Sequence, residues 1–179
     1  MNALLAYARF IDAVNDKFGA LAKWAVMLSC FISATNAVVR YLLSYSSNAF
    51  LEIQWYLFAA CVMLGASQVL RVNEHVRVDV FYGRLGGKRQ VCVDLFGLIF
   101  FLVPVMCAMI YFSFPLFLKM YETGEMSNNA GGLIRWPAML MLPLGFTLVL
   151  LQGIGEIFKR IGWLQHKYDM DIHYERPLQ

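Results

Sequence analysis

The histidines and nearby acidic residues are the groups most able to bind a metal or cofactor, and their positions exclude several chemistries. His75, His166 and His173 all lie outside the long apolar stretches of the chain. A haem inside a bundle of membrane helices needs axial ligands from within that bundle, so the sequence disfavours a haem subunit. Glu74, His75 and Asp79 lie close together in sequence, but their spacing fits no metal site. A solvated or subunit-contact surface is expected there.

The four cysteines are the next candidates for chemistry. Cys30, Cys61, Cys92 and Cys107 fall within or at the edge of apolar stretches, and none belongs to a CxxC pair. A membrane enzyme that oxidises disulfides would need a thiol pair at the outer face, so that class is disfavoured. The sequence also lacks a nucleophilic triad, a P-loop and a metal motif. We therefore expect neither an enzyme nor a cofactor bound by this chain.

Arg40 and Glu52 could form an ion pair. They flank the short connection between the first two apolar stretches, which must be antiparallel neighbours, so the two side chains are expected at similar depth. A charge inside a membrane span usually finds a partner, which favours the pair. The alternative is that Arg40 extends to the lipid headgroups while Glu52 faces water.

The elements that must position these residues are long apolar helices. The chain has 179 residues, of which 60% are apolar and only 15% charged. The apolar stretches are long enough to cross a hydrocarbon core of ~30 Å at ~1.5 Å per residue. We predict an all-α integral membrane protein, a single membrane domain over residues 1–179, with transmembrane helices at 20–43, 50–70, 91–118 and 137–155. Pro104 and Pro115 predict bends in the third helix.

The basic residues predict the orientation of these helices. Twelve of the fifteen lie in the N-terminal segment up to Lys23, in the second connection or in the tail at 156–179. Because Lys and Arg are retained on the cytoplasmic side, both termini are expected in the cytoplasm. The net charge of +3 therefore reports topology, and no nucleic-acid partner is expected.

Residues 1–19 have the pattern of an amphipathic helix. Apolar residues recur at helical spacing on one face, at Leu4, Tyr7, Ala8, Ile11, Val14 and Phe18. Such a helix can lie in the headgroup layer, which makes membrane lipid an expected partner. It can also pack on the rest of the protein, and the two arrangements are not exclusive.

A stripe of small residues predicts a contact surface for another helix. Ala25, Ser29, Ser33 and Ala37 recur every four residues along the first span. Small side chains allow the close backbone approach on which helix association in lipid depends. No acidic residue occupies the middle of a span, and we find no inverted repeat, so the sequence predicts a scaffold without its own transport site.

The order of several short motifs resembles the small membrane subunit, of the DctQ type, of tripartite ATP-independent periplasmic (TRAP) transporters. The resemblance covers most of residues 20–160. The motifs are Asn-Ala-Val-Val-Arg-Tyr at 36–41, Glu52, Gly-Ala at 65–66, Glu-His-Val-Arg-Val-Asp at 74–79, and Pro-Leu-Gly-Phe at 143–146 followed by Gln152. Segments 125–137 and 151–156 resemble a branch associated with 2-oxo acids and with mannitol or chloroaromatic compounds. Many relatives carry a second acidic residue after the one at Glu52, where this chain has Ile53.

The resemblance implies a division of labour in a bacterial inner membrane. A periplasmic binding protein would capture an organic acid, and a large multi-span subunit would move it with a sodium gradient, holding the sodium site itself. This chain would extend the scaffold, and the small-residue stripe, with Arg77 and Asp79, would contact the large subunit. The connection containing Glu122, Glu125 and Arg135 would contact the binding protein, or it is a merely structural loop. The alternative from another class is an autonomous transporter or channel formed by several copies of this chain.

Overall fold

The computed structural model describes residues 2–45, 47–73 and 87–169, and helices make up most of them. In chain order they are α1 (Asn2–Leu43), α2 (Asn48–Val72), α4 (Gly87–Gly97), the π-helix η1 (Leu98–Leu102), α5 (Val103–Thr123) and α6 (Trp136–Leu164). The β-pairing among these residues is one antiparallel bridge between Met126 and Ile134. The all-α prediction is confirmed, and four helices are long and apolar enough to cross a membrane.

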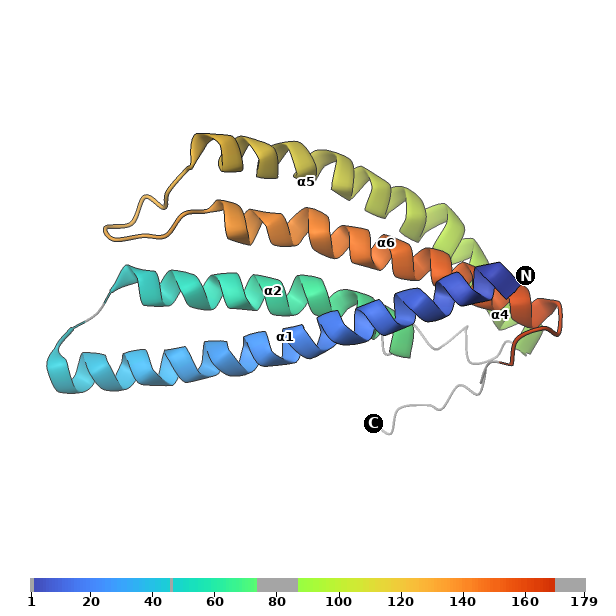
Figure 1. Ribbon diagram of the computed structural model, residues 1–179, viewed down its shortest axis with the longest axis horizontal. Coiled ribbons are helices and arrows are strands. Elements are labelled where there is room, and N and C mark those ends of the chain that lie inside the picture. The colour runs from blue at the N-terminus through green and yellow to red at the C-terminus, as the bar shows by residue number, and fades with distance from the viewer. Residues whose placement is uncertain (1, 46, 74–86, 170–179) are drawn as a thin grey trace.

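The helices lie side by side in the order α1, α2, α6 and α5 (Figure 1). A small core of Ala22, Leu64 and Leu148 forms where α1, α2 and α6 meet. The first half of α1 also crosses onto α6. α5 lies at the flank of this layer and packs against α6.

Large apolar side chains cover the outside of the helices. Phe31, Phe58 and Phe112, on three different helices, are each more than 60% exposed. In water such a surface would drive aggregation, whereas in a bilayer the lipid tails solvate it. The exposed surface therefore agrees with helices that cross a membrane.

α1 is a single helix from Asn2 to Leu43, so the structure does not separate an interfacial helix at 1–19 from the first span. Between the two predicted segments the chain has no proline, and Gly19 faces Gln68 of α2 at a distance that a Cβ could not keep. The close packing of α1 on α2 therefore stabilises the helix across Gly19. Of the two predicted arrangements, packing on the protein is the one the structure shows.

The buried face of the first half of α1 agrees with the predicted one at Ala8 and Ile11, with Val14 and Phe18 partly buried beside them, and differs from it at Leu4 and Asn15. Leu5, Ala8, Ile11 and Asn15 are buried, whereas Leu4 is 40% exposed. Periodicity arguments assign apolar residues to the inside, so they cannot anticipate a buried asparagine. Its burial depends on a partner in α6, described below.

α4, η1 and α5 form one continuous helix from Gly87 to Thr123 that contains the predicted span 91–118. The wider turn of η1 lies just before Pro104, where the Val103 N–H donates to the carbonyl of Leu98, five residues back. A proline has no N–H and its ring collides with the carbonyl four residues before it, so a regular α-helical turn is unfavourable here. This gives the predicted bend a specific form (Figure 1).

α6 continues nine residues past the predicted end of the last span at 155, to Leu164. Glu156, Lys159 and Arg160, which the sequence placed in a cytoplasmic tail, are buried side chains of this helix. Their carboxylate and cationic groups bind one another and charged groups of neighbouring helices, which offsets part of the cost of burying them.

Candidate functional site

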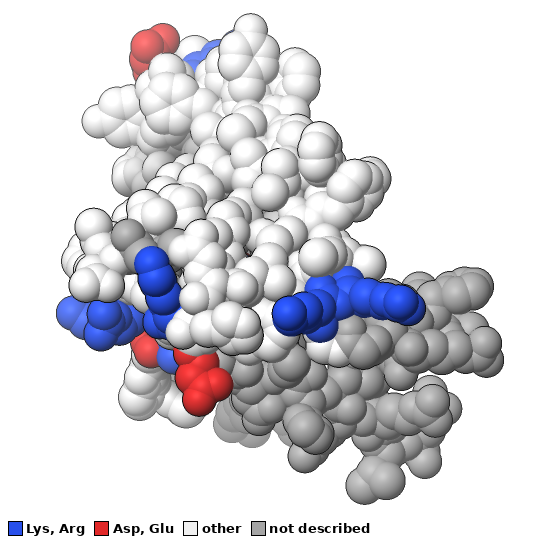
Figure 2. Space-filling view, turned by 90° about the vertical axis from the view of Figure 1, so that its right-hand side faces the viewer, with Lys and Arg blue, Asp and Glu red and all other residues white. Residues whose placement is uncertain are grey.

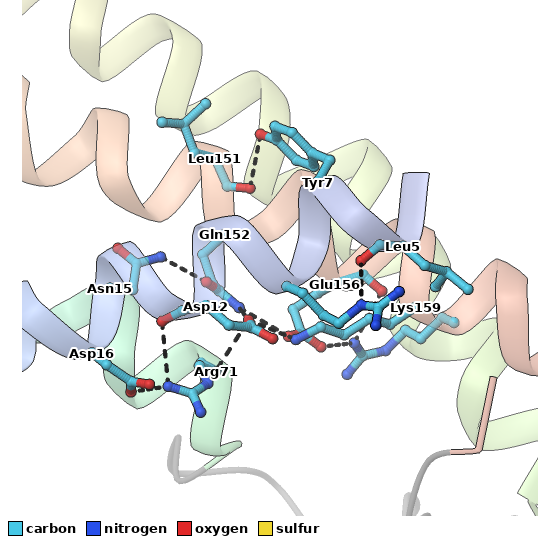
Figure 3. A network of polar contacts seen from close by, with 12 residues as sticks. Leu5, Tyr7, Asp12, Asn15, Asp16, Arg71, Leu151, Gln152, Glu156 and Lys159 are labelled. Carbon is cyan, nitrogen blue, oxygen red and sulfur yellow. Dashed lines mark hydrogen bonds and ion pairs between the residues drawn. The ribbon is translucent and has the colours of Figure 1, made fainter. Parts of the chain in front are cut away.

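A row of alternating charges joins the helices at the end where α1 begins. We call it the charge ladder, and its members are Asp16, Arg71, Asp12, Lys159, Glu156, Arg160 and Asp94. They come from α1, α2, α6 and α4, and α4 is the first part of the continuous helix that includes α5. The ladder therefore connects all four long helices. Figure 3 shows most of these side chains converging on Asp12 and Glu156.

Each cation of the ladder is shared by two carboxylates. Lys159 Nζ lies 2.8 Å from both Asp12 Oδ1 and Glu156 Oε1. Arg160 reaches Glu156 Oε2 at 2.6 Å and Asp94 Oδ2 at 3.1 Å. Arg71 binds Asp16 and lies 3.8 Å from Asp12 Oδ1. Shared in this way, the buried charges compensate one another.

Two carboxamides extend the ladder into the apolar part of the molecule. Asn15 and Gln152 are fully buried, and Asn15 Nδ2 donates to Gln152 Oε1 at 2.6 Å. Gln152 Nε2 in turn donates to Asp12 Oδ1 at 2.9 Å and Glu156 Oε1 at 3.0 Å (Figure 3). This explains why Asn15 is on the buried face of α1: it has a polar partner there.

Glu52 organises a second polar cluster at the opposite end of the helices. Its side chain is only 2% exposed although it lies near the start of α2. Glu52 Oε1 accepts hydrogen bonds from Ser127 Oγ and from Asn129 Nδ2, and Oε2 accepts one from the backbone N–H of Leu133 at 2.6 Å. One carboxylate thus receives three donors from the connection between α5 and α6.

That connection folds into a hairpin, residues 125–135, which we call the outer hairpin. Ser127 N–H donates to Leu133 C=O and Arg135 N–H donates to Glu125 C=O, each at 2.9 Å. Its turn needs glycine, because Gly131 has a φ of 71° and a Cβ on Gly132 would lie 2.5 Å from Ser127 Cβ and 3.0 Å from Glu52 Oε1.

Two further residues of α2 donate hydrogen bonds to backbone carbonyls of the outer hairpin. Asn48 Nδ2 donates to the carbonyl of Ala130 at 3.1 Å, and Tyr56 Oη donates to the carbonyl of Ile134 at 3.0 Å. With Glu52, these residues contact both sides of the turn, so the hairpin is fixed to α2 along its length.

The predicted ion pair between Arg40 and Glu52 must be corrected. Arg40 is exposed, and in the described part of the chain no ion pair joins it to Glu52. The physical reason is that the outer hairpin folds back over α2 and supplies Glu52 with nearer donors. The exposed Arg40 agrees with the alternative of a side chain that extends away from the helices.

The small-residue stripe is divided by the structure. Ala25 is buried and Ser29 Oγ donates to the carbonyl of Gln54, so this half packs against α2 of the same chain. Ser33 and Ala37 are exposed. Only the second half of the stripe is therefore open to another helix.

Glu122, Glu125 and Arg135 lie at the same end of the molecule but do not form one surface of free charge. Arg135 Nη1 pairs with Glu125 Oε1 at 2.7 Å, whereas Glu122 is exposed. The predicted contact residues Arg77 and Asp79 lie outside the described residues, as do Glu74 and His75.

A cavity of about 590 Å³ opens beside the π-helix, between the ends of α2 and α6 and the α4–η1–α5 helix. Its walls are apolar side chains such as Leu98 and Phe101, with Asp94 and Arg160 as the charged exceptions. These two are already paired in the charge ladder. The cavity thus offers apolar volume but no free charge to hold an anionic solute.

Several site residues escaped the sequence reasoning, namely Asp12, Asn15, Arg71 and the partners of Glu52. One signal was present, because Lys159 and Arg160 follow Glu156 at the i+3 and i+4 positions where helical side chains meet. Nothing in the sequence indicates that Gln152 binds Asn15, 137 residues away.

The family model described as "Tripartite ATP-independent periplasmic transporters, DctQ component" matches residues 29–162, well over half of the chain. The matched region includes Glu52, the outer hairpin and the α6 half of the charge ladder. No curated protein and no solved structure matches the chain.

Proposed function

The chain belongs to the DctQ component family of tripartite ATP-independent periplasmic transporters, and we propose that it works as a scaffold for the large membrane subunit. It is a multi-pass membrane protein and a transport subunit, not an enzyme. Its family implies a complex of three parts, the other two being a large membrane subunit and a periplasmic binding protein. The proposal concerns what this chain contributes to that complex.

The observation that supports a scaffold is where the charged groups lie and that they bind one another or the backbone. The polar clusters lie at the two ends of the helices, and within them carboxylates and cations bind one another or the backbone. In the described spans, the central segments 24–39, 53–70, 95–118 and 137–155 contain no charged residue. A solute site for an organic acid would need fixed cationic or donor groups at mid-membrane depth.

The proposed orientation places the charge-ladder end in the cytoplasm and the outer hairpin in the periplasm. Figure 2 views the molecule from the end where α1 begins, and Lys and Arg side chains lie on both sides of that face. Retention of Lys and Arg in the cytoplasm supports this orientation in a bacterial inner membrane.

The proposed contact with the large subunit is the exposed half of the small-residue stripe, Ser33 and Ala37. Small side chains let another helix approach closely, and helix association in lipid depends on such packing. Arg77 and Asp79 remain part of this proposal through the sequence resemblance alone.

The proposed cargo is an organic acid, moved by the large subunit with a sodium gradient. The support is the resemblance of segments 125–137 and 151–156 to the branch associated with 2-oxo acids and with mannitol or chloroaromatic compounds. The sodium site belongs to the large subunit in this proposal.

Co-purification in mild detergent tests the scaffold proposal. We expect the wild-type chain to hold the large subunit in a stable complex, and Ser33→Leu with Ala37→Leu to lose it. Thr35→Leu is the matched control, because Thr35 is exposed at the same depth and lies on the opposite side of α1. Each variant should elute alone as a single species, which separates lost binding from misfolding. A uniform homo-oligomer that ignores the large subunit would support the autonomous channel instead.

A further inference from the structure

The cavity beside the π-helix is a groove along one face of the α4–η1–α5 helix, and exposed cations lie just beyond one end of it. We propose that this groove binds one acyl chain of an anionic phospholipid from the inner leaflet, and that Arg89 binds the lipid phosphate. The proposal goes beyond the scaffold function. Only the assignment to the inner leaflet depends on the proposed orientation, so the lipid site and the scaffold can fail separately.

The shape of the groove is the first observation. Its lining residues recur every fourth residue along one helix, in a row formed by Val93, Gly97, Phe101 and Val105 and in a second row beside it from Asp94 to Met106. From the first of these residues to the last, the helix advances ~20 Å at ~1.5 Å per residue. The groove is therefore elongated and runs parallel to the helix axis.

The width of the groove decides which kind of molecule can fill it. A volume of about 590 Å³ over that length corresponds to a mean cross-section of ~30 Å². A helix with its side chains is ~10–12 Å across and needs ~80–110 Å², so a helix of another subunit is too wide to lie in the groove. A single hydrocarbon chain, whose atoms pack ~4 Å from their neighbours, is narrow enough.

The groove is open to the lipid phase. Its lining residues Val93, Phe101 and Val105 are each at least 48% exposed, and they belong to a helix apolar enough to cross a membrane. A Cβ on Gly97 would meet no atom within 4 Å among the described residues, so the floor of the groove is open at its middle. A lipid chain can therefore enter the groove sideways from the bilayer.

The charges near the groove fix the direction of the lipid. Within the groove, Asp94 and Arg160 are paired with each other, so the interior suits an apolar chain and not an anion. Arg89 lies four residues before Val93, and so one turn beyond the end of the groove on the same row. Because helical side chains point back toward the start of their helix, the Arg89 guanidinium extends away from the apolar end of the groove.

The cations at this end match an anionic headgroup. Lys88 and Arg89 are exposed, and neither forms an ion pair with another described residue. A guanidinium binds phosphate oxygens through two parallel N–H donors, and clustered basic residues at a membrane surface attract anionic lipids. Cations followed by an apolar groove repeat the order of a phospholipid, in which the phosphate precedes the acyl chain.

Native mass spectrometry of the full chain in mild detergent, titrated with phosphatidylglycerol, tests the headgroup contact. The wild type should bind one phosphatidylglycerol more tightly than phosphatidylcholine with the same acyl chains. Arg89→Gln should weaken the binding of phosphatidylglycerol about fivefold and remove this preference. Lys17→Gln is the matched control, because Lys17 is an exposed cation on α1, away from the groove, and its loss should leave the Kd unchanged.

Gly97→Leu tests the groove itself in the same titration. The leucine side chain would occupy the middle of the groove, where no described atom blocks it, and should abolish binding of the first lipid. Ala108→Leu is the control, since Ala108 is exposed on α5 and does not line the groove. Without added lipid, the thermal midpoint of Gly97→Leu should equal or exceed that of the wild type, which separates a filled groove from misfolding.

Three outcomes would overturn the proposal. These are wild-type affinity for phosphatidylglycerol in Gly97→Leu, wild-type affinity in Arg89→Gln, and no preference of the wild type for phosphatidylglycerol over phosphatidylcholine.

The same measurement on the complex with the large subunit excludes another occupant of the groove. The wild-type complex should carry one more phosphatidylglycerol than the Gly97→Leu complex. Equal lipid numbers would mean that the large subunit covers the groove, which would also overturn the proposal. Failure of the complex to form would count against the scaffold and not against the lipid site, because the titration of this chain alone does not depend on it.

Discussion

Two buried glutamates at opposite ends of the molecule bind different kinds of partner. Glu156 binds the side chains of Lys159 and Arg160, so its negative charge is balanced by cations on its own helix. Glu52 instead receives neutral donors from the outer hairpin. The first fixes helices to one another, and the second fixes a loop to a helix.

Lys159 is the residue at which the charge ladder should be most sensitive. Lys159→Met removes the cation shared by Asp12 and Glu156 and leaves both carboxylates partly buried without it. Breaking a buried ion pair on one side typically costs about 3 kcal/mol or more. We expect Lys159→Met to lower the midpoint of thermal unfolding clearly. The unfolding is measured in mild detergent by tryptophan fluorescence.

Lys119→Met is the matched control for this prediction, because Lys119 is an exposed lysine on α5. Its midpoint should stay within the error of the wild-type value, as exposed charges contribute little. Equal midpoints for the two variants would show that the charge ladder does not stabilise the fold.

At this scale the sequence predicted which residues are unusual better than it predicted their partners. Glu52 and Arg40 stand out in the sequence as charges near the ends of apolar stretches. The donor that Glu52 receives from Leu133 lies 81 residues further along the chain. Periodicity and depth carry no information on a loop that folds back, so they predict the charge nearer in sequence, Arg40, as the partner of Glu52.

At the scale of the helices, glycines decide how closely neighbours approach. A Cβ on Gly145 of α6 would lie 2.7 Å from Met63 Cβ and 2.8 Å from the Met63 carbonyl oxygen of α2. A Cβ on Gly97, in contrast, meets no atom within 4 Å among the described residues. The two glycines thus have opposite environments within long helices.

We predict opposite effects for alanine at these two positions. Gly145→Ala should destabilise the fold by about 1–3 kcal/mol, because backbone of α2 blocks the added methyl group. Gly97→Ala should be neutral or stabilising by up to about 1 kcal/mol, because alanine favours the helix more than glycine does. Thermal unfolding of both variants in one detergent checks this. A Gly145→Ala midpoint equal to that of Gly97→Ala would contradict the close contact of α2 and α6.

The helices themselves were largely predictable, and their ends were not. Apolar stretches of this length can hardly be anything but membrane helices, so all four spans were found. The continuation of α1 through Gly19, and of α6 past residue 155, depends on packing against α2 and on the charge ladder. The prolines indicated a bend, and its form as a π-helix follows from Pro104. The sequence does not show that Leu102, at the end of this π-helix, lies against Gly153 of α6.

At the scale of the whole molecule, the structure is a layer of helices with a polar cluster at each end. The charge ladder connects α1, α2, α6 and α4 at one end, and the outer hairpin connects α5 and α6 to α2 at the other. Fixed at both ends, the layer is suited to remain still while a partner moves. The asymmetry of the basic residues, which the sequence shows directly, is the basis for its proposed orientation.

Solute flux in proteoliposomes that contain this chain alone tests the central claim most directly. A scaffold without a transport site should give no uptake of an organic acid above empty vesicles, with or without a sodium gradient and the loaded binding protein. Uptake should begin when the large subunit is reconstituted with it and the binding protein is supplied. Flux through this chain without the large subunit would contradict the account and favour a homo-oligomeric channel.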